Sequence, residues 1–159
     1  MGNTMNVQYL ILTVGLPASG KSTWADEYCA YTLETVQVER DQIRIEENLP
    51  FGTDEDRVTD IQRRMIYCEL NAGNDVVVSD LNLSPKYRNK LVNWAKQRVP
   101  DVQVRYKLFT DVPLLTCIER NKLRPNSTRI PEQTIRDLYY NLIVTNKFMT
   151  GIRPEEIMQ

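Results

Sequence analysis

The segment Gly15-Leu16-Pro17-Ala18-Ser19-Gly20-Lys21-Ser22 has the residue types and the spacing of a phosphate-binding loop. It follows the apolar run YLILTV and matches the P-loop pattern G-x-x-x-x-G-K-[ST]. The glycines allow a phosphate to come close, and successive N–H groups at a helix N-terminus form a nest for an anion. Lys21 is expected to reach the β- and γ-phosphates, and the Ser22 hydroxyl to ligate Mg²⁺. The pattern predicts a nucleotide site, the alternative being a turn that matches by chance.

A second block with possible chemistry, VERDQIR, runs from Val38 to Arg44, directly after a predicted strand. Active sites of open α/β sheets lie beyond the carboxyl ends of the strands, which puts Asp41 at that edge. If the chain turns helical there, Asp41 and Arg44 share one face. A carboxylate near an arginine stays ionised, which suits accepting a hydroxyl proton. Arg44 could also position a phosphate of the acceptor, and a plain surface salt bridge remains the alternative.

Asp80 ends a third predicted strand, after three valines. P-loop proteins often hold an acid at this point, near Mg²⁺ or its waters. The alternative is that Asp80 begins an Asx-type turn into residues 81–84. The position favours a functional acid without fixing its role.

The fourth candidate is the basic stretch ERNKLRPNSTRIP, which contains Arg120 and Arg124 at helical i,i+4 spacing. We call these two residues the arginine pair. The residues that follow are polar, basic and bounded by prolines, and we call residues 121–131 the lid segment. Such a segment is typical of a lid that carries arginines onto a transferring phosphate, with a solvated basic loop as the alternative.

The elements that must position these residues alternate between strand and helix. Continuous apolar runs over Val7 to Val14 and Val76 to Asp80 predict central parallel strands, whereas alternation over Thr35 to Glu39 and Val102 to Phe109 predicts edge strands. The strand order 2-3-1-4 satisfies both patterns. With right-handed crossovers this predicts a three-layer α/β P-loop fold, a parallel sheet of about four strands flanked by helices.

Helices fill the intervals between the strands. They are expected from Ser22 to about Ala30, from Ser84-Pro85 onward, through Leu114 to the arginine pair, and from Pro131 onward. A further helix is expected to pack through the stripe Val58, Ile61, Met65, Cys68 and Ala72. The remaining basic residues, including Arg88 and Lys90, are expected on solvated helix faces.

Composition excludes several kinds of chemistry. The 159 residues contain no histidine, so a general base must be a carboxylate or another non-imidazole group, and the three cysteines are too widely spaced to form a metal-binding pair. The net charge of −1 argues against a grip on long duplexes and favours a local grip on a short single-stranded end. The N-terminal MGNTMN is unlike a secretory signal and no apolar run could span a bilayer, so we expect a cytoplasmic protein that binds no membrane.

In this order the blocks resemble the 5′-kinase domain of the bacteriophage polynucleotide kinases, end-healing enzymes of RNA repair. The resemblance covers about Leu10 to Asn146, nearly the whole chain. The P-loop is common to many kinases, whereas the other blocks in this order are more specific. The segments that carry it are ILTVGLPASGKSTWA, VERDQIR, VVVSDLNLSPKYR, ERNKLR and IPEQTIRDLYYN.

The resemblance implies a role for each matching residue. Asp41 would be the general base on the 5′-hydroxyl, and Arg44 would contact the acceptor or the transferred phosphate. Lys21 and the arginine pair, Arg120 and Arg124, would stabilise charge on the moving phosphoryl group. Asp80 would support the site. The expected reaction is ATP-dependent transfer of a phosphoryl group to a 5′-hydroxyl end.

The expected binding sets follow from the same resemblance. ATP is expected at Gly15, Pro17, Ala18, Ser19, Gly20, Lys21, Ser22, Thr23, Arg120 and Arg124. The single-stranded 5′-hydroxyl end of RNA or DNA is expected at Arg40, Asp41, Arg44 and Asp80. Mg²⁺ is expected at Ser22 and Asp80.

The sequence departs from the family pattern in two ways. The family places a second acid after the base, whereas Gln42 stands there. The phage enzymes also continue into a phosphatase domain with a D-x-D-x-T motif, which this sequence lacks. We therefore expect a single kinase domain over residues 1–159. The alternatives are a kinase that acts on a nucleoside, sugar or antibiotic hydroxyl, and a nucleotide-binding switch.

Overall fold

A parallel sheet of four strands forms the centre of the fold, in the order β2-β3-β1-β4. The computed structural model describes residues 7–159, so the expectation about the MGNTMN sequence lies outside the described residues. The strands are β1 (Tyr9–Val14), β2 (Thr35–Val38), β3 (Asp75–Val78) and β4 (Gln103–Leu108). The predicted fold class and strand order are confirmed.

Burial explains which strands are central. In β1, the residues from Leu10 to Val14 are fully buried, because β1 pairs with β3 on one side and β4 on the other. In the edge strand β4, Val104 and Tyr106 are buried while Arg105 and Lys107 between them are partly accessible. Continuous and alternating apolar patterns thus mark central and edge strands, as expected for a sheet covered on both faces.

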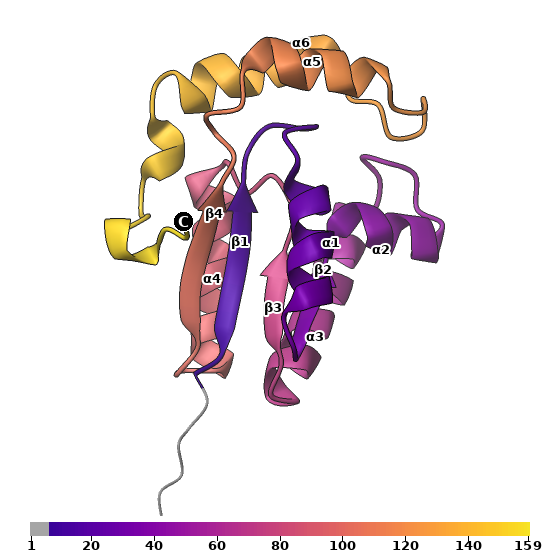
Figure 1. Cartoon of the computed structure of the whole chain (residues 1–159). Helices are drawn as coiled ribbons and strands as arrows, with labels where there is room; N and C mark the ends of the chain where they lie inside the picture. Colours follow the sequence, from indigo (N-terminus) through magenta and orange to yellow (C-terminus); the bar gives the residue numbers. More distant parts are fainter. Residues whose placement is uncertain (1–6) are drawn as a thin grey trace, which may run out of the picture.

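Helices cover both faces of the sheet and one end of it. They are α1 (Lys21–Tyr31), α2 (Arg40–Glu47), α3 (Glu55–Asn71), α4 (Pro85–Arg98), α5 (Leu114–Lys122) and α6 (Glu132–Leu138). The π-helix η1 (Tyr139–Ile143) and the 3₁₀-helices η2 (Lys147–Met149) and η3 (Pro154–Glu156) follow. Figure 1 shows α5 and α6 lying across the end of the sheet toward which the strands point. No helix within residues 7–159 is long and apolar enough to cross a membrane.

Two hydrophobic clusters hold these layers together. The smaller one joins Ala25 of α1 to Ile11 and Val77 on one face of the sheet. The larger one lies on the other face and buries side chains of α3 and α4 against β1 and β3. The P-loop therefore connects β1, at the centre of the sheet, to α1 on one face. Helices α2 and α3 follow β2 in the chain, and α3 packs on the opposite face.

Helix α3 faces the core with only part of the predicted stripe: Val58 is buried and Ile61 and Met65 pack against the core, whereas Cys68 and Ala72 do not. Its buried residues follow i,i+4 spacing and include one polar side chain: Val58, Gln62, Ile66 and Leu70. Cys68, which the prediction placed in the stripe, is exposed. The apolar pattern was misleading because it treats Gln62 as a surface residue, although its amide is hydrogen-bonded inside the protein.

Arg88 in α4 is buried, so its predicted place on a solvated face is wrong. Its side chain is 1% exposed and its guanidinium lies 5.6 Å from the Tyr106 ring centroid. The two terminal nitrogens donate to the carbonyl of Asn82 at 2.9 Å and the carbonyl of Thr150 at 2.7 Å. Arg88 thereby joins α4 to the loop after β3 and to the C-terminal segment, whose carbonyls would otherwise lack these partners.

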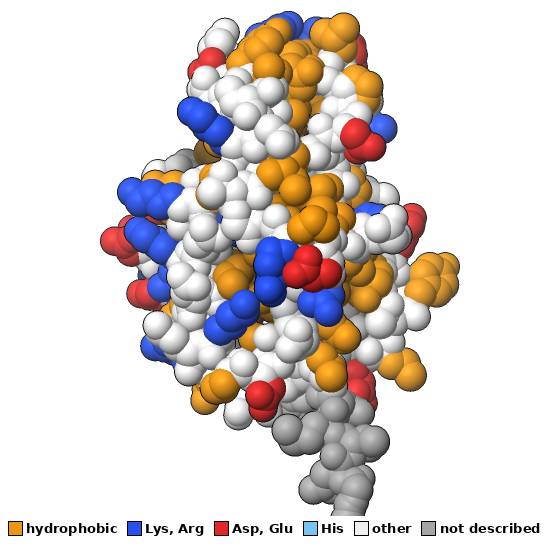
Figure 2. Space-filling view, turned by 90° about the vertical axis from the view of Figure 1, so that its left-hand side faces the viewer, with side chains coloured by type: hydrophobic (Ala, Val, Ile, Leu, Met, Phe, Trp, Pro, Cys, Tyr) orange, Lys and Arg blue, Asp and Glu red, His pale blue; other side chains and the backbone are white. Residues whose placement is uncertain are grey.

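The outer edge of β4 is partly covered by the end of the described chain. The N–H of Met158 donates to the carbonyl of Tyr106 at 2.8 Å, and Lys107 Nζ donates to the carbonyl of Gln159 at 2.9 Å. Figure 2 looks at the side of the molecule on which β4 lies in Figure 1. Basic side chains stand there in small groups beside acidic ones, and hydrophobic side chains form a broken band. This side therefore presents no long basic track for a duplex.

We predict that Arg88→Ala lowers the free energy of unfolding by about 2–5 kcal/mol, because two carbonyl groups lose their donor and a cavity opens. Lys90→Ala, in the same helix but exposed, should stay within about 0.5 kcal/mol of the unmodified protein. Urea unfolding followed by circular dichroism measures both. Equal effects of the two substitutions would contradict the assigned role of Arg88.

Candidate active site

The P-loop backbone is shaped by close packing around its glycines. A Cβ at Gly15 would lie 2.7 Å from Ser19 Oγ and 2.8 Å from the Cβ of Phe109, so no larger residue fits. Gly20 has φ 105° directly before α1, a conformation that favours glycine. The N–H groups of the first turn of α1, Lys21 to Thr23, have no helical partner by the geometry of any helix. The loop therefore offers backbone donors where the sequence predicted an anion nest.

Lys21 is held inside this loop. Its side chain is 6% exposed, and Nζ donates to the carbonyl of Leu16 and to Ser19 Oγ. Burial, followed by the nearby charge of Arg124, lowers the pKa of Lys21 to about 8. The nearby carboxylates of Asp80 and Glu39 offset this lowering only in part, so the buried ammonium would gain from the further negative charge of a bound phosphate.

Ser22, the residue after the P-loop lysine, donates from Oγ to Oε2 of Glu39 at 3.1 Å. Two more donors reach the same oxygen, Ser79 Oγ at 2.9 Å and Gln37 Nε2 at 3.1 Å. Glu39 was missed by the sequence prediction, which treated the block after β2 as a pair of Asp41 and Arg44. The available signal was its place at the strand end, two residues before Asp41.

Asp80 lies just after β3 with both carboxylate oxygens engaged. Oδ1 accepts from the N–H of Arg40 at 2.9 Å, and Oδ2 accepts from Gln62 Nε2 at 2.6 Å. Asp80 thus stabilises the first turn of α2, where a negative charge is favourable. Burial nevertheless raises its pKa to about 6, against the lowering effect of these hydrogen bonds. The turn that follows is stabilised instead by Asn82, whose amide donates to the carbonyl of Thr13 at 2.9 Å.

The three expected acceptor residues of α2 have side chains in different environments. The Arg40 guanidinium points to α3, donating to Thr59 Oγ1 at 3.0 Å and Glu55 Oε2 at 2.9 Å. Asp41 is exposed. Arg44 is buried and donates to the carbonyls of Pro50 at 2.9 Å and Thr53 at 2.6 Å, besides an ion pair with Glu55.

The helical spacing predicted for Asp41 and Arg44 is therefore present, but no ion pair joins them among the described residues. Arg44 instead orders the loop between α2 and α3, with its guanidinium 5.9 Å from the Phe51 ring centroid. Asp41 is left as a carboxylate open to solvent beyond the carboxyl end of β2.

The arginine pair meets the P-loop from α5 and the turn that follows it. Arg120 lies in α5, whereas Arg124 lies beyond the last helical residue, Lys122, so the predicted helical i,i+4 pairing is wrong. Arg120 Nη1 donates to the carbonyl of Ala18 at 3.4 Å, and Arg124 is close enough to lower the pKa of Lys21. Between α5 and α1 lies a cavity of about 500 Å³, lined by Ala18, Ser19, Gly20, Thr23, Trp24, Glu27, Arg120 and Arg124. Besides the arginine pair, four residues of the predicted ATP set thus line this cavity. A fifth, Lys21, borders the cavity through its hydrogen bond to Ser19.

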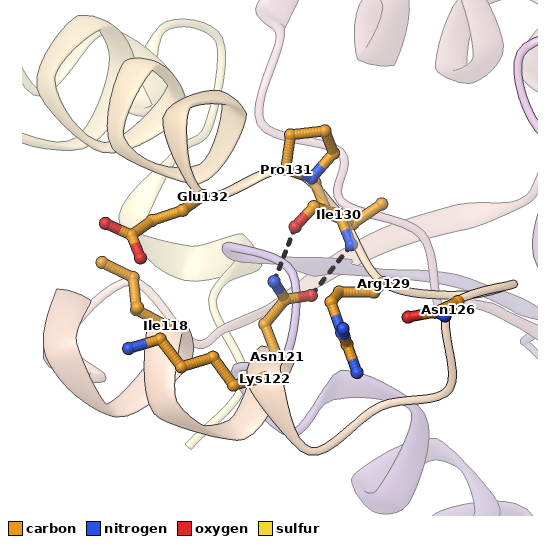
Figure 3. Close-up of a pocket in the computed structure, with 8 residues that line it drawn as sticks. All are labelled: Ile118, Asn121, Lys122, Asn126, Arg129, Ile130, Pro131 and Glu132. Atoms are coloured by element: carbon orange, nitrogen blue, oxygen red, sulfur yellow. Dashed lines mark hydrogen bonds between the residues drawn. The ribbon is translucent and has the colours of Figure 1, made fainter.

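The lid segment is closed at its base by Asn121 (Figure 3). This side chain is 3% exposed; its Nδ2 donates to the carbonyl of Ile130 at 2.6 Å, and its Oδ1 accepts from the N–H of Ile130 at 3.0 Å. Arg129 donates to the carbonyl of Arg124 at 2.7 Å within the same loop. Figure 3 shows Asn121, Arg129 and Ile130 among the residues around a second cavity, of about 290 Å³. The lid segment is thus a closed loop rather than an open chain.

The oxygen atoms at the ends of β2 and β3 fit a magnesium ion. Mg²⁺ prefers oxygen ligands and usually keeps several waters, with one or two protein groups and the substrate phosphates. Ser22 Oγ and the Glu39 carboxylate lie together there, and Asp80 follows on the adjacent strand. Residues 7–159 contain no cluster of three or more acidic, cysteine or histidine ligands, so an all-protein cage is not formed within this range.

Comparison with known proteins places the chain among P-loop proteins. A family model described as AAA domain matches residues 10–142. A protein of Autographa californica nuclear polyhedrosis virus, named "Putative bifunctional polynucleotide kinase/RNA ligase", is 26% identical over 155 residues. These residues are 87% of this chain and 21% of the viral protein, so the chain spans about a fifth of that relative's length.

Solved structures share the fold. A chain of the Pnkp1/Rnl/Hen1 RNA repair complex superposes with a TM-score of 0.72 and 24% identity, over 92% of this chain and 47% of that one. A gluconokinase from Sinorhizobium meliloti 1021 superposes with a TM-score of 0.50 and 24% identity, over 84% of this chain and 74% of that one. These similarities establish the architecture and leave the acceptor to be argued from the site.

We predict that Asp80→Asn removes a pH-dependent contribution to the stability of the protein. Because the pKa of Asp80 is raised from 3.8 to about 6, the folded state keeps a proton that the unfolded chain releases between about pH 4 and pH 6. Stability from this group therefore declines across that window and is level above it. The stability of the variant relative to the unmodified protein should therefore be about 1–3 kcal/mol more favourable at pH 7 than at pH 4, on top of a cost, equal at both pH values, for the one donor that Asn leaves without an acceptor. Urea unfolding at both pH values measures this, and a difference independent of pH would contradict it.

We also predict that Asn121→Ala opens the lid segment. Losing two hydrogen bonds of about 1 kcal/mol each should raise tryptic cleavage after Lys122 and Arg129 by roughly 10-fold or more. Asn126→Ala is the matched control, because Asn126 is exposed and lines the same cavity. Limited proteolysis followed by mass spectrometry measures the rates, and equal cleavage of the two variants would count against the assignment.

Proposed function

The chain belongs to the AAA domain family, and we propose that it is an ATP-dependent kinase that transfers the γ-phosphate to a 5′-hydroxyl end of RNA or DNA. The observation that carries this proposal is the convergence of three parts at one end of the sheet. The P-loop supplies Lys21, α5 and the turn after it supply the arginine pair, and the start of α2 supplies the exposed carboxylate of Asp41.

The residues of the nucleotide side have roles that their positions support. The cavity between α1 and α5 would take ATP, with the phosphates at the N-terminus of α1 and the arginine pair above them. Lys21 would exchange the carbonyl of Leu16 for a phosphate oxygen, which restores the charge balance that burial disturbs. The arginine pair would stabilise the negative charge that spreads over the moving phosphoryl group.

Magnesium would be held at Ser22 with help from the carboxylates at the ends of β2 and β3. When bound there, the ion neutralises charge on the β- and γ-phosphate oxygens. The surrounding hydrogen bonds of Ser22 and Asp80 keep these groups in place before any ligand arrives.

On the acceptor side, Asp41 would accept the proton of the attacking hydroxyl. Its exposure gives an acceptor direct access, and the absence of histidine leaves a carboxylate as the natural base. Arg40 and Arg44 brace α2 against α3 and the loop between them, so both would position Asp41. A direct contact of Arg44 with the acceptor remains a prediction.

A polynucleotide acceptor is supported by the order of the sequence blocks and by the names of two relatives. The site is open to solvent at Asp41, which suits the end of a chain, and the net charge of −1 suits a local grip. A kinase that acts on a small hydroxyl compound shares the same parts, as the gluconokinase relative illustrates. The acceptor therefore has to be decided by assay.

We predict that Asp41→Asn lowers turnover by about 10²–10⁴-fold while nucleotide affinity changes little, because general-base catalysis is lost and the P-loop is untouched. The measurement is transfer of labelled γ-phosphate from ATP with Mg²⁺. The acceptors are a 5′-hydroxyl RNA, a DNA of the same sequence, a nucleoside 3′-monophosphate and gluconate.

Asp56→Asn is the matched control, since Asp56 is an exposed aspartate in the first turn of α3. Label on the oligonucleotides that is lost with Asp41→Asn supports the proposal. Label on gluconate or the nucleotide alone makes the chain a small-molecule kinase. ATP binding without transfer to any acceptor favours a nucleotide-binding switch.

A further inference from the structure

The hydrogen bonds of Glu39 are distributed unevenly over its two carboxylate oxygens. Oε2 accepts from Ser22 Oγ, Ser79 Oγ and Gln37 Nε2, at 3.1, 2.9 and 3.1 Å. Among the described residues, no donor reaches Oε1. A half-buried carboxylate is thus fixed through one oxygen, while the other remains available to a ligand.

The three donors come from three different elements, which fixes the position of the carboxylate. Gln37 belongs to β2, Ser79 directly follows β3, and Ser22 belongs to the first turn of α1. Glu39 itself is the extended residue between β2 and α2, with φ −135° and ψ 133°. A carboxylate held in this way loses little further freedom when it binds a cation, so binding there is favoured.

The bond from Ser22 to Glu39 is compatible with a cation on the serine. A hydroxyl oxygen that ligates a cation uses a lone pair, and its proton then needs an acceptor elsewhere. Glu39 Oε2 already accepts that proton. Cation binding at Ser22 therefore does not require this hydrogen bond to break, and it places the positive charge beside Glu39.

Asp80, the acid expected at the cation from the sequence, is less suited to bind it. Both of its oxygens accept hydrogen bonds from the protein, from the N–H of Arg40 and from Gln62. A cation would have to displace or share those donors. Glu39 has a free oxygen and a direct bond to the P-loop serine, so the two acids are not equivalent.

We propose that Glu39 is the carboxylate of the divalent cation site, in which Oε2 holds the Ser22 hydroxyl and Oε1 binds the cation or one of its waters. The proposal rests on the proposed nucleotide site and adds a residue that the sequence prediction did not include. The block Glu39-Arg40-Asp41 then divides its tasks. Its first carboxylate serves the cation, and its second, exposed on α2, serves the acceptor.

The test is cation binding to the protein–ADP complex, which needs no acceptor and no turnover. Mn²⁺ takes the same oxygen ligands as Mg²⁺ and its bound and free forms are counted by electron paramagnetic resonance. We expect Glu39→Gln to weaken Mn²⁺ binding to the protein–ADP complex by about 10–100-fold. ADP affinity in the presence of EDTA should change by no more than about twofold, because neither Lys21 Nζ nor the backbone N–H groups of the P-loop bond to Glu39.

Two further variants separate loss of the carboxylate from loss of structure. Glu46→Gln is the matched control in the adjoining helix α2, where Glu46 is exposed and accepts from Gln42. It should leave Mn²⁺ affinity unchanged. Glu39→Asp keeps the charge on a shorter side chain, and it should lose less affinity than Glu39→Gln. Thermal unfolding of each variant, followed by circular dichroism, establishes that the fold is retained.

The outcomes distinguish this inference from the proposed function. Equal Mn²⁺ affinity of the folded Glu39→Gln variant and the unmodified protein would overturn the role of Glu39. Failure of the unmodified protein to bind Mn²⁺ with ADP would overturn it as well. Weaker Mn²⁺ binding in Glu39→Gln supports the role of Glu39 even if no polynucleotide is phosphorylated, in which case only the acceptor assignment fails.

Discussion

The parallel pairing of the four strands is the constraint on which the candidate site depends. Parallel strands end at the same edge of a sheet. Strand pairing alone therefore brings together residues that are far apart in the sequence, even where they make no direct contact. The P-loop follows β1, Glu39 follows β2 and Asp80 follows β3. Parallel sheets need helices on both faces, and the burial of β1 and β3 in two hydrophobic clusters supplies the free energy that holds this edge together.

At this edge, hydrogen bonds assign different tasks to similar side chains. Glu39 and Asp80 are both carboxylates after a strand, yet one is fixed through a single oxygen and the other through both. Arg40 and Arg44 are both arginines near Asp41, and both are used to brace α2. Among the described residues, Asp41 is the one exposed carboxylate in the first turn of α2. Local hydrogen bonding, rather than residue type, thus separates the groups engaged within the protein from those left free for a ligand.

The lid segment is likewise positioned by hydrogen bonds and by the placement of two helices. Helices α5 and α6 lie across the end of the sheet, so the arginine pair reaches the P-loop from outside it. Asn121 ties the loop between these helices through two hydrogen bonds to Ile130. A loop closed at its base keeps its shape as a unit, which would suit the lid role predicted for it.

The sequence by itself determined the strand order, the P-loop and the arginine pair. Each of these depends on a local pattern: continuous or alternating apolar residues, glycines before a lysine, and basic residues at the end of a predicted helix. The burial of Arg88 and Gln62, the bracing role of Arg44 and the place of Glu39 beside Ser22 were decided by tertiary structure. Their partners lie on other elements, and a polar residue that is buried to meet a distant partner has no periodic signature in the chain. Only the packing of α2, α3 and the three strand ends determines which polar groups remain free.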